Sequence, residues 1–65
     1  MNILINGQPL QLDVGSSVHQ ALAAFGARPP VAVAVNGRFL PRGQHQSTRL
    51  EEGDSLEVLG PMEGG

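Results

Sequence analysis

The stretch VAVAVNGRFLP (residues 31–41) predicts a β-hairpin and decides the fold class. Its first arm alternates valine with alanine and is apolar on both faces, which is typical of a strand inside a sheet or of one whose second face is covered. Asn36 and Gly37 form the turn, because this pair tolerates the positive φ angles of a tight hairpin. Pro41 ends the second arm, since proline cannot donate to a strand ladder.

The same turn pair occurs near the N-terminus, in MNILINGQPLQLDV (residues 1–14). Apolar and polar residues alternate on both sides of Asn6-Gly7, as they do in half-buried strands. The pattern predicts a second hairpin, with its apolar positions at Ile3, Ile5, Leu10, Leu12 and Val14.

Between the hairpins, GSSVHQALAAFG (residues 15–26) predicts a short helix. Ser17 is a good N-cap, Gln20 completes a capping box, and Gly26 is a natural C-cap. Pro29-Pro30 prevents any continuation of the helix. Residues at helical spacing give one apolar stripe, formed by Val18, Ala21, Leu22 and Phe25.

The rest of the chain predicts a polar loop over residues 42–54 and a last strand in SLEVLG (residues 55–60). Leu56 and Val58 face one way in this strand, and Gly60-Pro61 stops it. The order ββαββ, with one helix to cover one face of a sheet, indicates an α+β fold. We expect a domain over residues 1–60 and a flexible tail over residues 61–65.

Composition excludes several functions. The chain has 65 residues, no cysteine and only two histidines, far apart in sequence, so we expect no metal site. Any reactive thiol must belong to a partner. A net charge of −2, with arginine as the only basic residue type, disfavours nucleic-acid binding. The longest apolar run is too short to span a membrane, and the N-terminus lacks a secretory signal. We therefore expect a cytoplasmic protein.

No pattern for catalysis stands out. The chain has no G-x-G-x-x-G and no Walker loop. Ser16 and Ser17 lie near His19, but Ser17 is better explained as a cap, and no third group is evident to orient a catalytic pair. The adjacent Glu51 and Glu52 are explained as a solvated acidic loop. We expect a protein that is not an enzyme by itself.

The final residues, PMEGG (residues 61–65), are the remaining candidate. A frayed terminus is one explanation. The other is a tail that is threaded into a partner's active site, because Gly64 and Gly65 have no Cβ atoms and pass a narrow channel in any conformation. Attack of the terminal carboxylate on ATP would give an acyl-adenylate, from which a partner's thiolate or persulfide displaces AMP.

Three segments together resemble the ubiquitin-like β-grasp proteins, and within them most closely the bacterial thiamine-biosynthesis sulfur carriers. The segments are VNGRFLPR (residues 35–42), RLEEGDSLEV (residues 49–58) and the terminal PMEGG, and the helix also looks like that of the family. The resemblance covers essentially the whole chain. It implies a mixed sheet of four to five strands with one helix packed on it.

The family's functional residues can be carried over to this sequence. Gly65 would bear the adenylate and then the thiocarboxylate, and Gly64 would keep the approach narrow. Pro61, Met62 and Glu63 would form the arm that enters the partners.

The resemblance also implies the partners. An adenylyltransferase related to the ubiquitin-activating enzymes would use ATP and magnesium, while the carrier itself binds no cofactor. Thiazole synthase would receive the sulfur, which a cysteine desulfurase or rhodanese-type protein would supply indirectly.

By analogy with the fold, docking would use the exposed face of the sheet near the tail. Phe39, Leu59 and the strand over residues 31–35 are candidates for this face. The alternative, which a core this small favours, is that all three belong to the ordinary core. Met62-Glu63 stands where ubiquitin has arginines, which argues against the eukaryotic conjugation machinery.

Other functions stay open. The small subunit of molybdopterin synthase shares the fold and the Gly-Gly end, although that family is usually longer. A carrier for another sulfur pathway is a further alternative. A β-grasp binding module belongs to a different class, because it has no need of a free Gly-Gly end.

Overall fold

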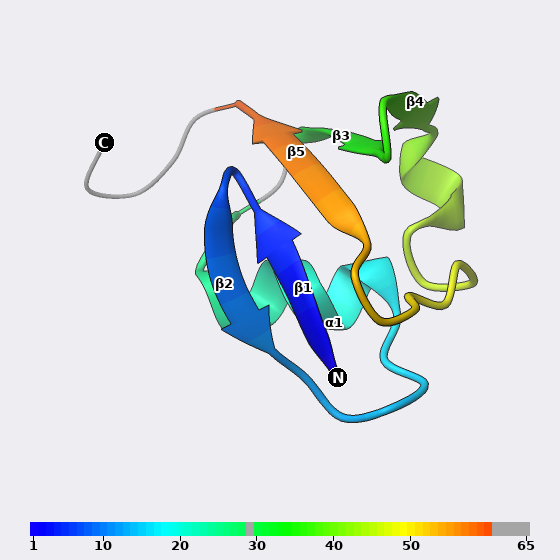
Figure 1. Ribbon diagram of the computed structural model, residues 1–65. Coiled ribbons are helices and arrows are strands. Elements are labelled where there is room, and N and C mark those ends of the chain that lie inside the picture. The colour runs from blue at the N-terminus through cyan, green and yellow to red at the C-terminus, as the bar shows by residue number, and fades with distance from the viewer. Residues whose placement is uncertain (29, 61–65) are drawn as a thin grey trace.

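The computed structural model describes residues 1–28 and 30–60 (Figure 1). A single layer of strands lies against one helix. The elements in chain order are β1 (Asn2–Ile5), β2 (Gln8–Gln11), α1 (Val18–Phe25), β3 (Ala32–Val35), β4 (Arg38–Leu40), the 3₁₀ helix η1 (Arg42–Gln44) and β5 (Ser55–Leu59).

The strands form one mixed sheet in the order β2-β1-β5-β3-β4. Both hairpins are antiparallel, and β5 lies between them, parallel to β1 and antiparallel to β3. The first and last strands of the chain are thus central neighbours in the sheet. This is the β-grasp arrangement, and the prediction of an α+β fold with a mixed sheet is confirmed.

Both predicted hairpin turns are present. Asn6 and Asn36 have φ angles of 51° and 50°, and the glycine that follows each of them is also at positive φ. Asparagine is among the few residues with a side chain that adopt this conformation readily, which explains why both turns use it.

The helix begins and ends as predicted. The Oγ of Ser17 accepts the backbone N–H of Gln20 at 3.2 Å, and the Gln20 side chain accepts the N–H of Ser17 at 2.8 Å, which completes the capping box. Gly26 closes the helix in the left-handed conformation, and its N–H donates to the carbonyls of Leu22 and Ala23. Local sequence therefore fixes both ends.

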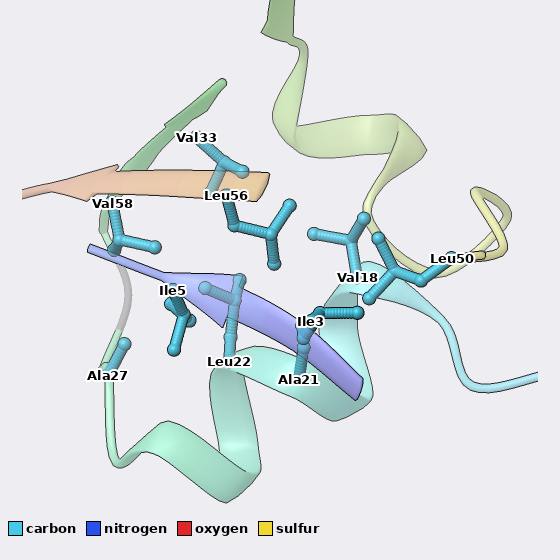
Figure 2. Packing of buried hydrophobic residues seen from close by; sticks show 10 residues of the cluster. All are labelled: Ile3, Ile5, Val18, Ala21, Leu22, Ala27, Val33, Leu50, Leu56 and Val58. Atoms are coloured by element: carbon cyan, nitrogen blue, oxygen red, sulfur yellow. The ribbon is translucent and has the colours of Figure 1, made fainter. Parts of the chain in front are cut away.

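The core lies between α1 and one face of the sheet (Figure 2). The largest fully buried side chains come from the helix and from the three central strands: Ile3, Ile5, Val18, Val33 and Leu56. The helical stripe and the alternating positions of β1 and β5 supply most of this core, as the sequence pattern predicts.

Two strand boundaries differ from the prediction. The second arm of the first hairpin ends at Gln11 and does not reach Val14, which is 88% exposed. The cause is a turn in which both the N–H and the Oγ of Ser16 donate to the carbonyl of Asp13, at 3.1 and 2.7 Å. This turn directs the chain toward the helix. In the second hairpin, β3 begins at Ala32 rather than at Val31.

The segment over residues 42–54 is a loop, as expected, but it is more ordered in structure than its polar sequence indicates. It contains η1, and Leu50 packs into the core at 3% exposure. The N–H groups of Val18 and His19 donate to the carbonyls of Thr48 and His45 in this loop, at 3.0 and 2.9 Å. The loop thereby satisfies two donors that the first turn of a helix leaves open.

Candidate functional site

The face of the sheet that points away from α1 carries apolar side chains that the core does not use. In β5, burial alternates along the strand, so that Leu56 and Val58 face the helix while Glu57 and Leu59 face outward. On this outward face Phe39 is 70% exposed and Leu59 is 73% exposed. Exposed apolar side chains that gather on one face mark a binding surface more often than single ones do.

Strand register brings these residues together. Ala34 lies opposite Phe39 on one side and opposite Glu57 on the other, and Ala32 lies opposite Leu59. We call this surface the docking face. Small alanine side chains in its middle leave a hollow of about 140 Å³, which is lined by Ala32, Val33, Ala34, Phe39, Glu57 and Leu59.

The structure decides between the two interpretations of these apolar residues. The expectation that Phe39 and Leu59 belong to the core is wrong, because the helix covers the opposite face of the sheet and cannot reach them. The strand over residues 31–35 divides instead: Val33 is in the core, and Ala32 is exposed. Its central position, between β5 and β4, accounts for its apolar sequence on both faces. That partners dock here stays a prediction.

The docking face extends to the end of the last strand. Leu59, one of its two large apolar residues, is the last residue of β5, and Gly60 follows it directly. The tail residues singled out from the sequence, Pro61, Met62, Glu63, Gly64 and Gly65, lie outside the described part of the chain.

Gly60 is packed closely against the start of β3. Its φ angle is 151°, and a Cβ atom placed on it would lie 2.9 Å from the carbonyl oxygen of Pro30 and 3.2 Å from Cγ1 of Val31. Only glycine fits this position without a shift of the neighbouring backbone. The sequence marks Gly60 as a strand terminator, but not as a residue in close contact with the segment that precedes β3.

Two asparagine side chains hold β5 in place from either side. The sequence did not predict these contacts. Asn6 is bonded to Val58 through both atoms of its amide, and Asn36 is bonded to Ser55 and Asp54. The only signal in the sequence was the repeated Asn-Gly pair, which local turn chemistry already explains. A partner some 18 to 52 positions away leaves no local pattern.

The other candidates remain structural. Ser17 is occupied as the helix cap, and His19 is exposed on α1, so no Ser–His pair with a buried base is formed. Glu51 and Glu52 are exposed, and one Oε of Glu52 accepts the N–H of Asn2 at 2.9 Å. No helix over the described residues is long and apolar enough to cross a membrane.

Comparison with known proteins agrees with this geometry. A model of the ThiS family matches residues 3–65. The chain is similar to the sulfur carrier protein ThiS of Escherichia coli (strain K12), with 32% identity over 66 residues and with 100% of each chain covered. It is also similar to the crystal structure of the thiamine biosynthesis protein ThiS from Geobacter metallireducens, with a TM-score of 0.79, 33% identity and full coverage of both chains.

A second solved structure, the solution NMR structure of a thiamine biosynthesis protein from the same organism, gives a TM-score of 0.74 at 33% identity. That match covers 100% of this chain and 88% of the other. These similarities favour the thiamine pathway over the alternatives that the sequence alone left open. The chain therefore belongs to the ThiS family of sulfur carriers in thiamine biosynthesis.

Proposed function

We propose that this chain carries sulfur as a thiocarboxylate on Gly65 and delivers it to thiazole synthase. The observation that carries the proposal is that the match to the ThiS family extends over residues 3–65 and so includes both glycines of the tail. The chain has no cysteine and so cannot carry sulfur as a persulfide of its own, which fits a carrier that uses the carboxylate of Gly65, as the resemblance to the family implies.

The reaction needs two displacements. A carboxylate oxygen of Gly65 attacks the α-phosphorus of ATP, an O–P bond forms, and pyrophosphate leaves. A sulfur nucleophile equivalent to HS⁻, supplied by a partner, then attacks the acyl carbon, so that a C–S bond forms, the C–O bond breaks and AMP leaves. Both steps take place in the active site of an adenylyltransferase related to the ubiquitin-activating enzymes, which uses ATP and magnesium. The carrier is a co-substrate in this scheme and not a catalyst.

Each tail residue has a role in this scheme. Gly64 keeps the chain narrow where it enters the partner, because it has no side chain. Pro61, Met62 and Glu63 connect it to the folded domain. Five residues beyond Gly60 reach about 17 Å when extended, which is enough to enter an active site from its rim.

The docking face would bind the partner enzymes. Phe39 and Leu59 offer exposed apolar surface, and Leu59 lies one residue before the chain leaves the fold. Glu57 lies two residues before Leu59 on the same face of β5 and fits a basic side chain on the partner. Binding on this face and entry of the tail would thus occur together.

The direct test is the intact mass of the protein after incubation with ATP, magnesium, a sulfide donor and the host's carrier-activating enzyme. We expect a gain equal to the exchange of one oxygen for sulfur, which fragmentation places on Gly65. A variant lacking Gly64 and Gly65 keeps its fold and shows no gain. If the full chain stays unchanged while the same enzyme modifies another carrier, the proposal is wrong and a binding module is favoured.

A second assay identifies the acceptor. Thiazole synthase and the thiocarboxylated chain are mixed with the remaining precursors of the thiazole, and sulfur incorporation is followed with a labelled carrier. We expect one label in the thiazole for each carrier consumed. A thiocarboxylate that forms but is not consumed would assign the chain to a different acceptor.

A further inference from the structure

The C-terminal end of β5 is held by a side chain rather than by a strand on one of its edges. The N–H of Val58 donates to Oδ1 of Asn6 at 2.8 Å, and Nδ2 of Asn6 donates to the carbonyl of Val58 at 3.2 Å. Asn6 thus satisfies both the N–H and the carbonyl of Val58, which point toward this edge.

The Asn6 amide takes the place of a peptide group. The backbone N–H of Asn6 donates to the carbonyl of Leu56 at 2.9 Å, as in a regular ladder between β1 and β5. After Asn6 the chain turns away into β2, so no backbone of β1 lies opposite Val58. The side-chain amide has the same donor and acceptor as a peptide and continues the ladder by one further step.

The opposite edge of β5 is also held near its C-terminal end. Leu59 pairs with Ala32 of β3, and Gly60 lies so close to Pro30 and Val31 that a Cβ atom would not fit. Figure 1 shows the turn between β1 and β2 beside the end of β5, near the point where the tail begins. The end of β5 is therefore held on both edges, at Val58 by Asn6 and at Leu59 and Gly60 by the segment over residues 30–32.

We propose that Asn6 is a positioning residue for the carrier's tail: by continuing the sheet at Val58, it fixes the direction in which the chain leaves the fold after Gly60. This inference rests on the proposed function, because a fixed exit matters only if the tail is delivered into an active site. Positioning of a reacting group by even an ångström has large effects on rate. Asn6 itself does not touch ATP or the reacting carboxylate.

The chain offers a matched control in Asn36. It lies in the same Asn-Gly turn at nearly the same φ, and its N–H also donates to a carbonyl of β5, that of Ser55. Its Oδ1 accepts the N–H of Ser55 at 2.9 Å, and its Nδ2 donates to Asp54 at 3.0 Å. Asn36 therefore also makes two side-chain hydrogen bonds, one to Ser55 at the start of β5 and one to Asp54 just before it, at the end far from the tail.

The experiment compares Asn6→Gly with Asn36→Gly, since glycine keeps the positive φ of each turn and removes only the side chain. The kcat and KM for each variant as the substrate of the host's activating adenylyltransferase are measured by pyrophosphate release. We expect Asn6→Gly to lower kcat by about 10- to 100-fold with KM within about twofold. Asn36→Gly should leave both close to those of the unchanged chain. Asn6→Asp keeps the acceptor for the Val58 N–H but places a carboxylate oxygen against the Val58 carbonyl, so it should lower kcat at least as much as Asn6→Gly.

Hydrogen exchange and residual dipolar couplings on the free protein test the same inference without a partner. Asn6→Gly should speed the exchange of the Val58 amide by at least about tenfold and change the orientation of the Leu59 and Gly60 amides. In Asn36→Gly only the Ser55 amide should respond.

Equal kcat values for the two glycine variants, or an effect of Asn6→Gly on KM alone, would overturn the inference. So would an unchanged orientation at Leu59 and Gly60. If the unchanged chain is not adenylated at all, the proposed function fails instead, and the measurements on the free protein still decide whether Asn6 fixes the exit. Should Asn6→Gly fail to fold, Asn6→Asp is compared with Asn36→Gly instead.

Discussion

Replacement of Phe39 by alanine is expected to separate docking from folding. Phe39 is 70% exposed in the free protein, so its side chain contributes little to the core. We expect the free energy of unfolding to change by no more than about 0.5 kcal/mol, as is usual for surface substitutions. A partner that covers the docking face would lose its apolar contact with the Phe39 ring in this variant, and its affinity would fall.

The size of that loss follows from the exposed area. A phenylalanine exposed to this extent offers on the order of 140 Å², and at about 25 cal/mol per Å² its complete burial is worth about 3.5 kcal/mol. Alanine retains part of this surface, so we expect a loss of about 2 kcal/mol, or roughly a 30-fold weaker Kd for the activating enzyme.

The assay is calorimetric titration of the host's activating enzyme with the unchanged chain, with Phe39→Ala and with Val14→Ala as the control. Val14 is the more exposed of the two at 88%, but it follows β2 and lies outside the docking face. We expect Val14→Ala to bind like the unchanged chain. If Phe39→Ala binds as tightly as Val14→Ala while both are folded, the docking face is assigned to the wrong surface.

Further substitutions test how the fold is held. Leu56→Ala removes a side chain with 0% exposure from the centre of the core and should cost about 2–5 kcal/mol in urea unfolding, a large part of the total for a chain of this size. Ser17→Ala removes the N-cap side chain and should lower the free energy of unfolding by about 1 kcal/mol in the same assay. Gln20→Ala removes the other half of the capping box and should also destabilise the protein; if it does not, the cap does not act through Gln20. Gly60→Ala places a Cβ atom 2.9 Å from the carbonyl oxygen of Pro30 and should lower the Tm, whereas an unchanged Tm would show that the chain exit is not closely packed.

Much of the local structure could be predicted from the sequence. Both Asn-Gly turns, the capping box at Ser17 and the C-cap at Gly26 depend on residues at most a few positions apart, and all of them are confirmed. The end of the second arm at Leu40, just before Pro41, is confirmed for the same reason. Where the prediction failed at Val14, a turn between Asp13 and Ser16 competes with the strand pattern.

The candidate site was predicted only in part. The sequence pointed to the tail through its two glycines, and the family match over residues 3–65 supports its importance. It favoured the core for Phe39 and Leu59, which is wrong, because the sequence of a strand does not show which face of the sheet the helix covers. The roles of Asn6 and Gly60 at the exit were not predicted, since their contacts are made with distant segments.

The sequence by itself determined the helix and the strands of this protein, their order and most of their ends, because propensity, capping and turn chemistry act between near neighbours in the chain. Only the tertiary structure decided that β5 enters between the two hairpins, that α1 covers one face of the sheet and leaves Phe39 and Leu59 on the other, and that Asn6 closes the ladder at Val58. These features arise from contacts between residues far apart in the chain. Such contacts form only when the strands have paired and the helix has buried its apolar stripe, so no short stretch of sequence contains them.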